Sequence, residues 1–213
     1  MKELTKIHSK NHPNIELKAI RGHFVTPNSH INYFLDMTTM KTRLSEASTA
    51  AKELSRQIML SMVVDTIVCI DGCEIIGAFL AEELTRAGVY SRNAHQTIYI
   101  VTPEYSASGQ MLFRDNYLPM IKGKNVLLLL ASATTGRTVT KTVQTLTYYG
   151  ASISGVSAIF SAANSVMGIP INALFHTSDI PEYKTYSSEE CALCKEKQPI
   201  DAFANAYGYS VIQ

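Results

Sequence analysis

Apolar positions in the middle of the chain follow a helical spacing in three places. From Ser45 to Met62, apolar side chains recur every three or four residues, which predicts an amphipathic helix. A second helix is expected from Glu74 to Ala87, because Gly88 follows it as a typical C-terminal glycine. A third is expected from Thr138 to Tyr149, again followed by a glycine.

Short apolar runs between these helices predict strands. Asn125–Leu130 is almost wholly apolar, as in a strand buried on both faces of a parallel sheet. The other expected strands are Thr66–Ile70, Thr97–Val101, Ile153–Phe160 and Ile171–Phe175. Strands that alternate with helices predict an α/β fold with a doubly wound, mostly parallel sheet. Thr102–Gly123 has no sustained period and is expected to be a long loop.

The two ends of the chain lie outside this pattern. We expect residues 1–44 to form an N-terminal hood, residues 45–180 the α/β core, and residues 181–213 a tail that packs on the hood. Ligands of such sheets bind beyond the carboxyl ends of the strands. Two of the loops expected there are Asp71–Gly77 and Ala131–Thr138.

Composition and charge narrow the class of protein. The chain has 213 residues, of which 46% are hydrophobic and 17% charged, as in a compact globular protein. Its net charge of +1 gives no sign of a nucleic-acid or anionic membrane surface. The polar first ten residues do not resemble a secretory signal, and the apolar run Val126–Leu130 is too short to cross a bilayer. We therefore expect a soluble, cytoplasmic protein without nucleic-acid or membrane partners.

The turn Ala131–Thr138 is the strongest candidate for chemistry. A buried strand, a Thr-Thr-Gly turn and a helix would bring free backbone amides and threonine hydroxyls to one point. Free amides at a helix start, together with the helix dipole, bind phosphate groups. An ordinary strand–helix turn with a threonine cap is the alternative.

The four cysteines give a weaker signal. Cys69 and Cys73 flank a predicted strand end and are expected to be buried thiols. Cys191 and Cys194 form a Cys-Ala-Leu-Cys pair, which is half of a zinc site, since a structural site needs four ligands. His176 or a second subunit is the evident source of further donors, so we assign no metal ligands. A plain turn in the tail is the favoured interpretation, and a zinc-linked interaction module is an alternative.

Several segments, in order along the chain, resemble the type I phosphoribosyltransferases, and most closely the orotate phosphoribosyltransferases. Val126–Thr138 is similar to the strand and loop that bind phosphoribosyl pyrophosphate (PRPP) in that family. Four further matches are Gly22-His23-Phe24 with Ser29-His30 and Tyr33, Gly72–Gly77 at the place of the pyrophosphate loop, Gly109–Arg114, and Cys191–Cys194 with Pro199-Ile200. The resemblance spans roughly residues 22 to 200.

The resemblance implies transfer of phosphoribosyl from PRPP to orotate in pyrimidine nucleotide synthesis, by a homodimer, with Mg²⁺ on the diphosphate. It implies that the 5′-phosphate is held by Thr134, Thr135, Gly136 and Thr138, with Ala133 and Arg137 beside them. It further implies a pyrophosphate loop of Asp71, Gly72, Cys73 and Glu74. Arg114, from the same or a neighbouring subunit, would reach the leaving group as the catalytic residue, and His23 and Phe24 would cover the base.

The sequence departs from the family pattern where the family holds the ribose hydroxyls. The acidic pair of the PRPP motif falls on Leu130 and Ala131, and Phe113 replaces one of two tandem arginines. Buried polar partners lost from a sugar site cost binding and rate. The first hypothesis is therefore an orotate phosphoribosyltransferase-like enzyme with impaired transfer. The second is a catalytically degenerate protein of the same fold that binds a nucleotide or phosphoribosyl ligand in a regulatory role.

Overall fold

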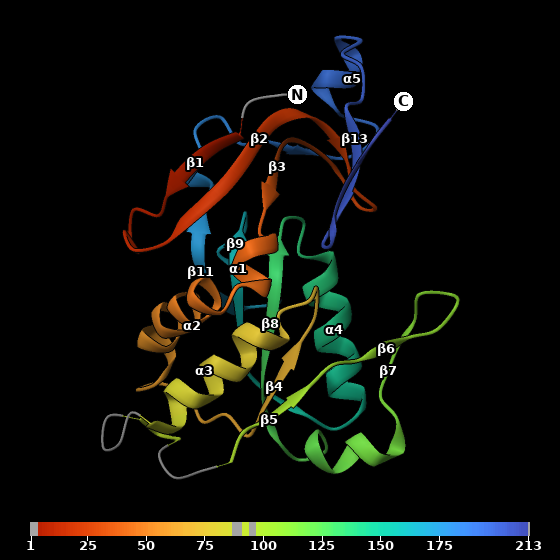
Figure 1. The fold of residues 1–213 in the computed structure, drawn as a ribbon. Helices are drawn as coiled ribbons and strands as arrows, with labels where there is room; N and C mark the ends of the chain where they lie inside the picture. The colour runs from red at the N-terminus through yellow and green to blue at the C-terminus, as the bar shows by residue number, and fades with distance from the viewer. Residues whose placement is uncertain (1–3, 87–90, 94–96, 213) are drawn as a thin grey trace.

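The computed structural model describes residues 4–86, 91–93 and 97–212, which form two six-stranded sheets and one two-stranded sheet, with helices around one of the two large sheets (Figure 1). This sheet, the core sheet, has the order β10-β11-β9-β8-β4-β5. Its strands are β4 (Thr66–Cys69), β5 (Tyr99–Val101), β8 (Asn125–Ala133), β9 (Ser152–Ser161), β10 (Ser165–Val166) and β11 (Ile169–His176). All neighbours pair in parallel except β10, which is antiparallel to β11.

Helices cover both faces of this sheet, as the alternating pattern predicts. The helices are α1 (Thr38–Thr42), α2 (Leu44–Ile58), α3 (Glu74–Arg86), α4 (Arg137–Tyr148) and α5 (Ala192–Lys195). The apolar sides of α2 and α3 pack in one core cluster, and that of α4 packs in a second cluster on the opposite face. The predicted α/β class with a doubly wound, mostly parallel sheet is confirmed.

Strand β8 lies at the centre of the sheet because both of its faces are apolar. Leu127, Leu129 and Ala131 belong to the cluster under α2 and α3. Leu128 and Leu130 point the other way and belong to the cluster under α4. A strand with period-two side chains must be apolar throughout to be buried on both faces.

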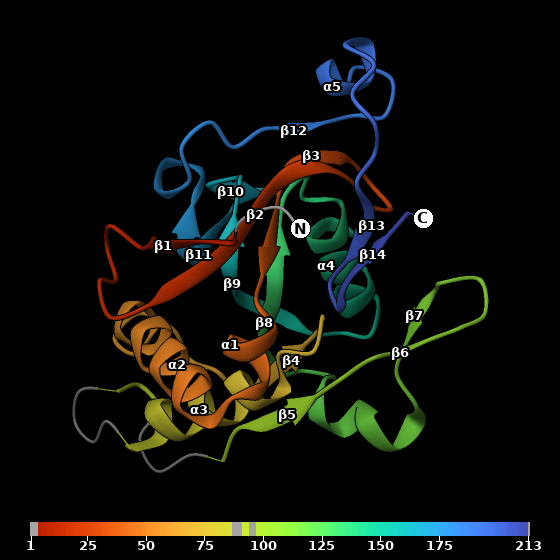
Figure 2. The same ribbon diagram turned by 45° about the horizontal axis from the view of Figure 1, so that its top comes forward.

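The second sheet, which we call the hood, is built from both ends of the described chain. Its order is β12-β3-β2-β13-β14, with β1 paired to β2. The strands are β1 (Leu4–His8), β2 (Glu16–Val25), β3 (His30–Asp36), β12 (Thr185–Tyr186), β13 (Ala202–Asn205) and β14 (Gly208–Val211). Figure 1 shows the hood across the carboxyl ends of the core strands, and Figure 2 shows it from above. The limits 1–44, 45–180 and 181–213 remain our proposal for hood, core and tail.

The structure corrects three local predictions. Thr102–Gly123 is not one loop: it contains β6 (Glu104–Tyr105) paired with β7 (Met111–Leu112), and the 3-10 helix η2 (Asp115–Met120). Strands of two residues are too short to give a periodic signal. Strand β8 continues to Ala133, because it pairs with β9 as far as Ser161. The short helix α1 was not expected.

The remaining boundaries agree to within a few residues. Helix α3 ends at Arg86, and the predicted Ala87 and Gly88 lie outside the described residues. Within the described part of the chain, no helix is both long and apolar enough to span a membrane.

Candidate functional site

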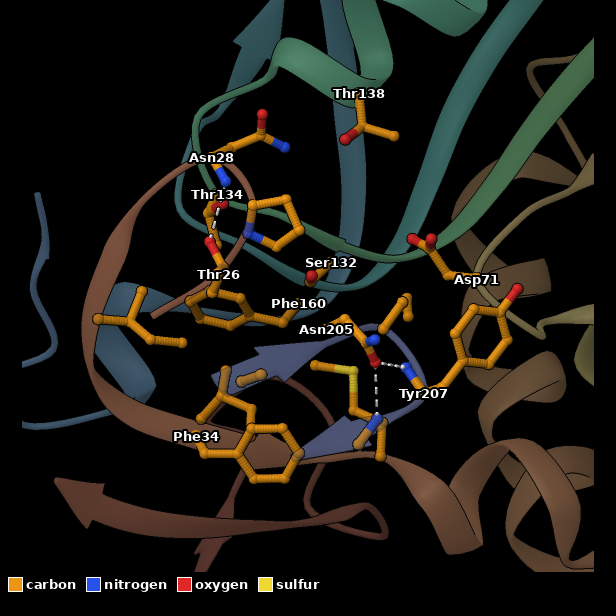
Figure 3. A pocket seen from close by; sticks show the side chains of 18 of the residues that line it. Thr26, Asn28, Phe34, Asp71, Ser132, Thr134, Thr138, Phe160, Asn205 and Tyr207 are labelled. Atoms are coloured by element: carbon orange, nitrogen blue, oxygen red, sulfur yellow. Dashed lines mark hydrogen bonds between the residues drawn. The ribbon is translucent and has the colours of Figure 1, made fainter. Parts of the chain in front are cut away.

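A cavity of about 300 Å³ lies between the core sheet and the hood (Figure 3). Its core side is formed by the ends of β4 and β8 and by the start of α4, represented by Asp71, Ser132 and Thr138. Its hood side is formed by two turns, Thr26–Asn28 after β2 and Asn205–Gly208 between β13 and β14. The cavity therefore lies where ligands of doubly wound sheets bind, and the hood closes it from above.

The predicted phosphate turn forms one end of this cavity. Thr134 and Thr138 line it, and Asn28 of the hood lies beside them (Figure 3). Gly136 precedes α4 in the left-handed region, with φ 72°, and has no side chain that could cap the helix. A Cβ on Gly136 would lie 2.8 Å from a methyl group of Val166, so only glycine fits without a shift of that side chain. The first amides of α4 and the positive end of its dipole are thus available to an anion.

Asp71 and Tyr207 stand at the opposite end of the cavity (Figure 3). Asp71 and Gly72 are successive left-handed residues, with φ 61° and 76°, in the turn between β4 and α3. Burial raises the pKa of the Asp71 carboxyl above its usual value, and Lys41 and a backbone hydrogen bond from Ala131 offset part of this rise. The turn holds one carboxylate at the cavity, at some cost in desolvation.

Lys41 connects the core turn to the hood. Its Nζ donates hydrogen bonds to the backbone oxygens of Asp71, at 2.8 Å, and Ala206, at 2.5 Å. The same Nζ lies 5.8 Å from the centroid of the Tyr207 ring, within cation–π range. The Asn205 side chain shapes this hood turn by accepting hydrogen bonds from the backbone amides of Tyr207 and Gly208. A buried cation, one carboxylate and an aromatic ring therefore meet at this end.

The middle of the cavity is apolar. Phe34 from β3, Phe160 from β9 and Tyr183 line it. The rings of Phe160 and Tyr183 are 4.9 Å apart and tilted toward an edge-to-face contact. Burial raises the pKa of the Tyr183 hydroxyl. This part of the cavity suits a flat, largely uncharged group, while its two ends suit charged ones.

A second, more open hollow adjoins the phosphate turn. It lies between Thr135, Arg137 and the hairpin β6–β7, represented by Gly109 and Gln110. Figures 1 and 2 show this hairpin projecting from the core beside α4. Thr135 and Arg137 therefore line a different space from Thr134, while Thr138 lies between the two spaces and lines both.

The structure does not bring every predicted site residue to the cavity. Cys73 is fully buried in the core under α3, and burial raises the pKa of its thiol. Glu74 begins α3 and accepts a hydrogen bond from Thr102, at 3.3 Å. Arg114 is exposed and pairs with Glu104, through Nε at 2.9 Å and Nη2 at 2.7 Å. These three residues lie apart from the described lining of the cavity.

The two hood residues proposed to cover the base also lie elsewhere. Phe24 packs inside the hood against Phe34 and Tyr209. His23 is buried beside His30 and the two tail cysteines. The turn Thr26–Asn28, three residues further along, covers the cavity instead.

Several lining residues gave no signal in the sequence. Lys41 belongs to a short helix without a recognisable pattern, and Asn205 and Tyr207 come from the tail. An Asn-x-x-Gly turn at Asn205–Gly208 could have been identified as a tight turn, but its place at the cavity depends on the hood sheet.

Comparisons with known proteins agree with this arrangement. No family model matches the sequence. Over 94 residues the chain is 33% identical to the orotate phosphoribosyltransferase of Chlorobium phaeobacteroides. These 94 residues are 44% of this chain and 47% of the relative. The matched segment thus spans about half the length of this curated relative.

Three solved structures are similar in fold. UMP synthase of Leishmania donovani matches with a TM-score of 0.57 and 14% identity, over 75% of this chain and 34% of that one. The orotate phosphoribosyltransferase of Aeropyrum pernix matches with a TM-score of 0.52 and 16% identity, over 75% of this chain and 88% of that one. The orotate phosphoribosyltransferase of Mycobacterium tuberculosis matches with a TM-score of 0.51 and 15% identity, over 76% of this chain and 91% of that one.

These similarities agree with three features of the structure. They are the parallel sheet, the strand–turn–helix at Thr134–Thr138 and the hood across it. The chain belongs to the type I phosphoribosyltransferase fold, and the part of its sequence that has a curated match is similar to an orotate phosphoribosyltransferase.

Proposed function

We propose that this protein binds PRPP and transfers its phosphoribosyl group to a pyrimidine base, orotate, with reduced turnover. One observation carries the proposal: the open start of α4 and the Asp71 turn face each other across a single cavity that the hood closes. A phosphorylated sugar next to a flat base requires an anion site, a carboxylate and an apolar wall within one cavity.

The 5′-phosphate would bind at Thr134–Thr138. The amides at the start of α4 and the hydroxyls of Thr134 and Thr138 donate to its oxygens, and the helix dipole favours its charge. Asn28 from the hood closes the same place. Gly136 lets the backbone approach the phosphate without a side chain in between.

The ribose and diphosphate would lie toward Asp71 and Lys41. Mg²⁺ commonly binds through one or two carboxylates together with substrate phosphates, and Asp71 is a carboxylate that fits this use. When bound, the ion would neutralise charge on the diphosphate. Lys41 would add positive charge, although its hydrogen bonds to two backbone oxygens fix its position. The base would then stack in the apolar middle, near Phe160.

Arg114 and a homodimer complete this proposal. Arg114 is exposed next to the projecting hairpin and is held by Glu104, so it could reach the leaving group of a neighbouring subunit's site. Breaking this ion pair by Glu104→Gln would free Arg114 without removing it.

A second candidate function is a regulatory protein that binds a phosphoribosyl or nucleotide ligand without turnover. The observation that favours it is the pair Leu130 and Ala131, which are 0% and 2% exposed and carry no polar side-chain atom where the family has acids. Transfer needs groups that stabilise positive charge on the ribose, whereas binding through the phosphate does not.

The experiment that separates these functions measures binding and turnover together. Titration calorimetry with ribose 5-phosphate, ribose and PRPP, with and without Mg²⁺, gives the affinities, and pyrophosphate release with orotate and other bases gives the rate. We expect binding of the phosphorylated compounds only, and slow release of pyrophosphate with orotate. Binding without any release over a panel of bases would favour the regulatory function.

Variants of α4 provide the control. Thr134→Val combined with Thr138→Val should weaken ribose 5-phosphate binding by roughly 100-fold, since two hydrogen bonds to a charged group are lost. Thr147→Val, at the exposed far end of the same helix, should leave the affinity unchanged. Equal affinities for the double variant and the wild type would refute the phosphate site.

A further inference from the structure

Four side chains that can bind a metal converge in the hood, outside the cavity. They are His23 from β2, His30 from β3, and Cys191 and Cys194 at the start of α5. Their ligand atoms all lie within 4.8 Å of one another. Residues that are 168 positions apart in sequence therefore meet at one point. Figures 1 and 2 label α5, at whose start the two cysteines lie.

Three of the four distances below match a tetrahedral site, and the fourth, between the two histidine nitrogens, is about 0.3 Å shorter than such a site requires. His23 Nε2 lies 3.0 Å from His30 Nδ1, and Cys194 Sγ lies 3.6 Å from the former and 3.4 Å from the latter. Cys191 Sγ is also 3.6 Å from His23 Nε2. Zinc bonds of about 2.0 Å to nitrogen and about 2.3 Å to sulfur put the ligand atoms of a tetrahedral site about 3.3 to 3.8 Å apart.

Hydrogen bonding alone does not account for this cluster. His23 Nδ1 lies 3.0 Å from the backbone oxygen of Gln198, which fixes the proton on Nδ1 and leaves Nε2 with one bare lone pair. Three groups nevertheless approach that single nitrogen, from His30, Cys191 and Cys194. One lone pair cannot accept three donors, but a cation at the centre satisfies all four atoms. A carbonyl that holds the second nitrogen of a metal-bound histidine is a common supporting contact.

We propose that His23, His30, Cys191 and Cys194 form a structural zinc site. Two thiolates and two imidazoles in a closed, four-ligand arrangement favour zinc over Mg²⁺ or Ca²⁺, which take oxygen ligands. His23, His30 and Cys191 are buried and Cys194 is exposed; with four protein ligands in place, a tetrahedral shell leaves no open position for a substrate. The histidine donors come from the hood itself, whereas the sequence alone suggested only His176 or a second subunit.

The ion would connect the tail to the strands that carry the two hood turns over the cavity, Thr26–Asn28 and Asn205–Gly208, which we call the roof. His23 and His30 flank the turn Thr26–Asn28, and Cys194 precedes β13, whose turn at Asn205–Gly208 forms the other half of the roof. Beside the site, the Asp201 carboxylate accepts a hydrogen bond from the His23 amide at 2.7 Å, and the Asp201 amide donates to the His23 oxygen at 2.8 Å. Zinc would therefore hold both roof turns in place without touching the ligand.

The test is the metal content of the untagged full-length protein, purified under reducing conditions and reconstituted with equimolar zinc. We expect one zinc per chain. Replacing zinc by Co²⁺ should give the intense visible bands of tetrahedral cobalt with thiolate ligands. Both measurements are made on the wild type, so they do not depend on whether a variant folds, and neither requires PRPP binding or turnover.

Variants identify the ligands. Cys194→Ser and His30→Asn should each lower zinc affinity by at least about 100-fold, beyond the loss typical of an outer contact. Cys69→Ala removes a buried thiol outside the cluster and should keep one zinc per chain. Chelation of the wild type should speed proteolysis between residues 187 and 201, while α2 and α3 stay protected.

Two results would overturn the proposal. They are a wild type that retains no more zinc than Cys194→Ser, and a cobalt spectrum without thiolate bands. Zinc binding without any PRPP binding would leave the zinc site standing and reject the proposed function.

Discussion

At the scale of single residues, Leu130 and Ala131 differ although they are adjacent. Leu130 points into the apolar cluster under α4, whereas Ala131 lies in the opposite cluster and lines the cavity. Side chains alternate across a strand, so only one of the two positions can present a side chain to the cavity. An acid at position 131 alone therefore tests whether a carboxylate at the cavity restores ribose binding. An acid at position 130 would not reach the cavity.

The first prediction compares the two positions. Leu130→Glu should lower the free energy of unfolding by several kcal/mol, because it places a carboxylate in an apolar core. Ala131→Asp should cost less and should increase affinity for ribose 5-phosphate relative to phosphate alone. Urea unfolding and calorimetry measure both effects, and Leu130→Met serves as the control, since a swap of similar volume usually costs under about 1.5 kcal/mol. A Leu130→Glu protein as stable as the wild type would contradict the assigned orientation.

The second prediction concerns Asp71, whose pKa burial raises above the ordinary value. Between the unfolded and folded pKa values, the folded state binds more protons than the unfolded state, so stability falls as pH rises through the folded pKa. Asp71→Asn should remove this part of the pH dependence. The free energy of unfolding of both proteins, measured from pH 3 upward, gives the difference curve. A curve that rises with pH would mean that Lys41 outweighs burial.

At the scale of elements, the start of α4 depends on Gly136. The preceding strand ends at Ala133 because β9 pairs with it that far, and three residues then turn the chain into the helix. Both the left-handed φ and the nearby Val166 side chain require glycine at the turn.

The third prediction follows from these two constraints. Gly136→Ala should destabilise the protein by about 1–2 kcal/mol through the left-handed backbone alone, and should move the amides that bind phosphate. Adding Val166→Ala should relieve the steric contact but not the backbone cost. Urea midpoints and NMR titration with inorganic phosphate distinguish the two. Full recovery of stability in the double variant would show that the backbone conformation costs nothing.

At the scale of the whole molecule, hood and core share one apolar cluster. Leu17 and Ala19 of β2 pack in the same cluster as Ile67 of β4 and Phe175 of β11. A shared core couples the two sheets, although each has its own hydrogen bonding.

The fourth prediction is that both sheets unfold in one transition. Leu17→Ala should lower the stability of hood and core together, by about 3 kcal/mol, as is typical of a buried leucine. Hydrogen exchange followed by mass spectrometry at increasing denaturant reports each sheet through its own peptides. Exposure of hood peptides at lower denaturant than peptides of β8 would indicate a hood that unfolds by itself.

The sequence by itself determined the core of this protein. Helices α2 and α4 and strand β8 were predicted because each buries an apolar face whose period can be read over many residues. The Thr-Thr-Gly turn was predicted as well, because a local turn at a helix start needs only neighbouring residues.

Tertiary structure decided what depends on distant pairing. The hood sheet joins β2 to β13, so the roof turn at Asn205–Gly208 and the partners of Cys191 and Cys194 could not be read from spacing along the chain. The two-residue strands β6 and β7 carry no period, and Lys41 acts through two carbonyls that only folding brings together. Local sequence specifies local periods, whereas contacts over more than 160 residues are set by which surfaces can pack.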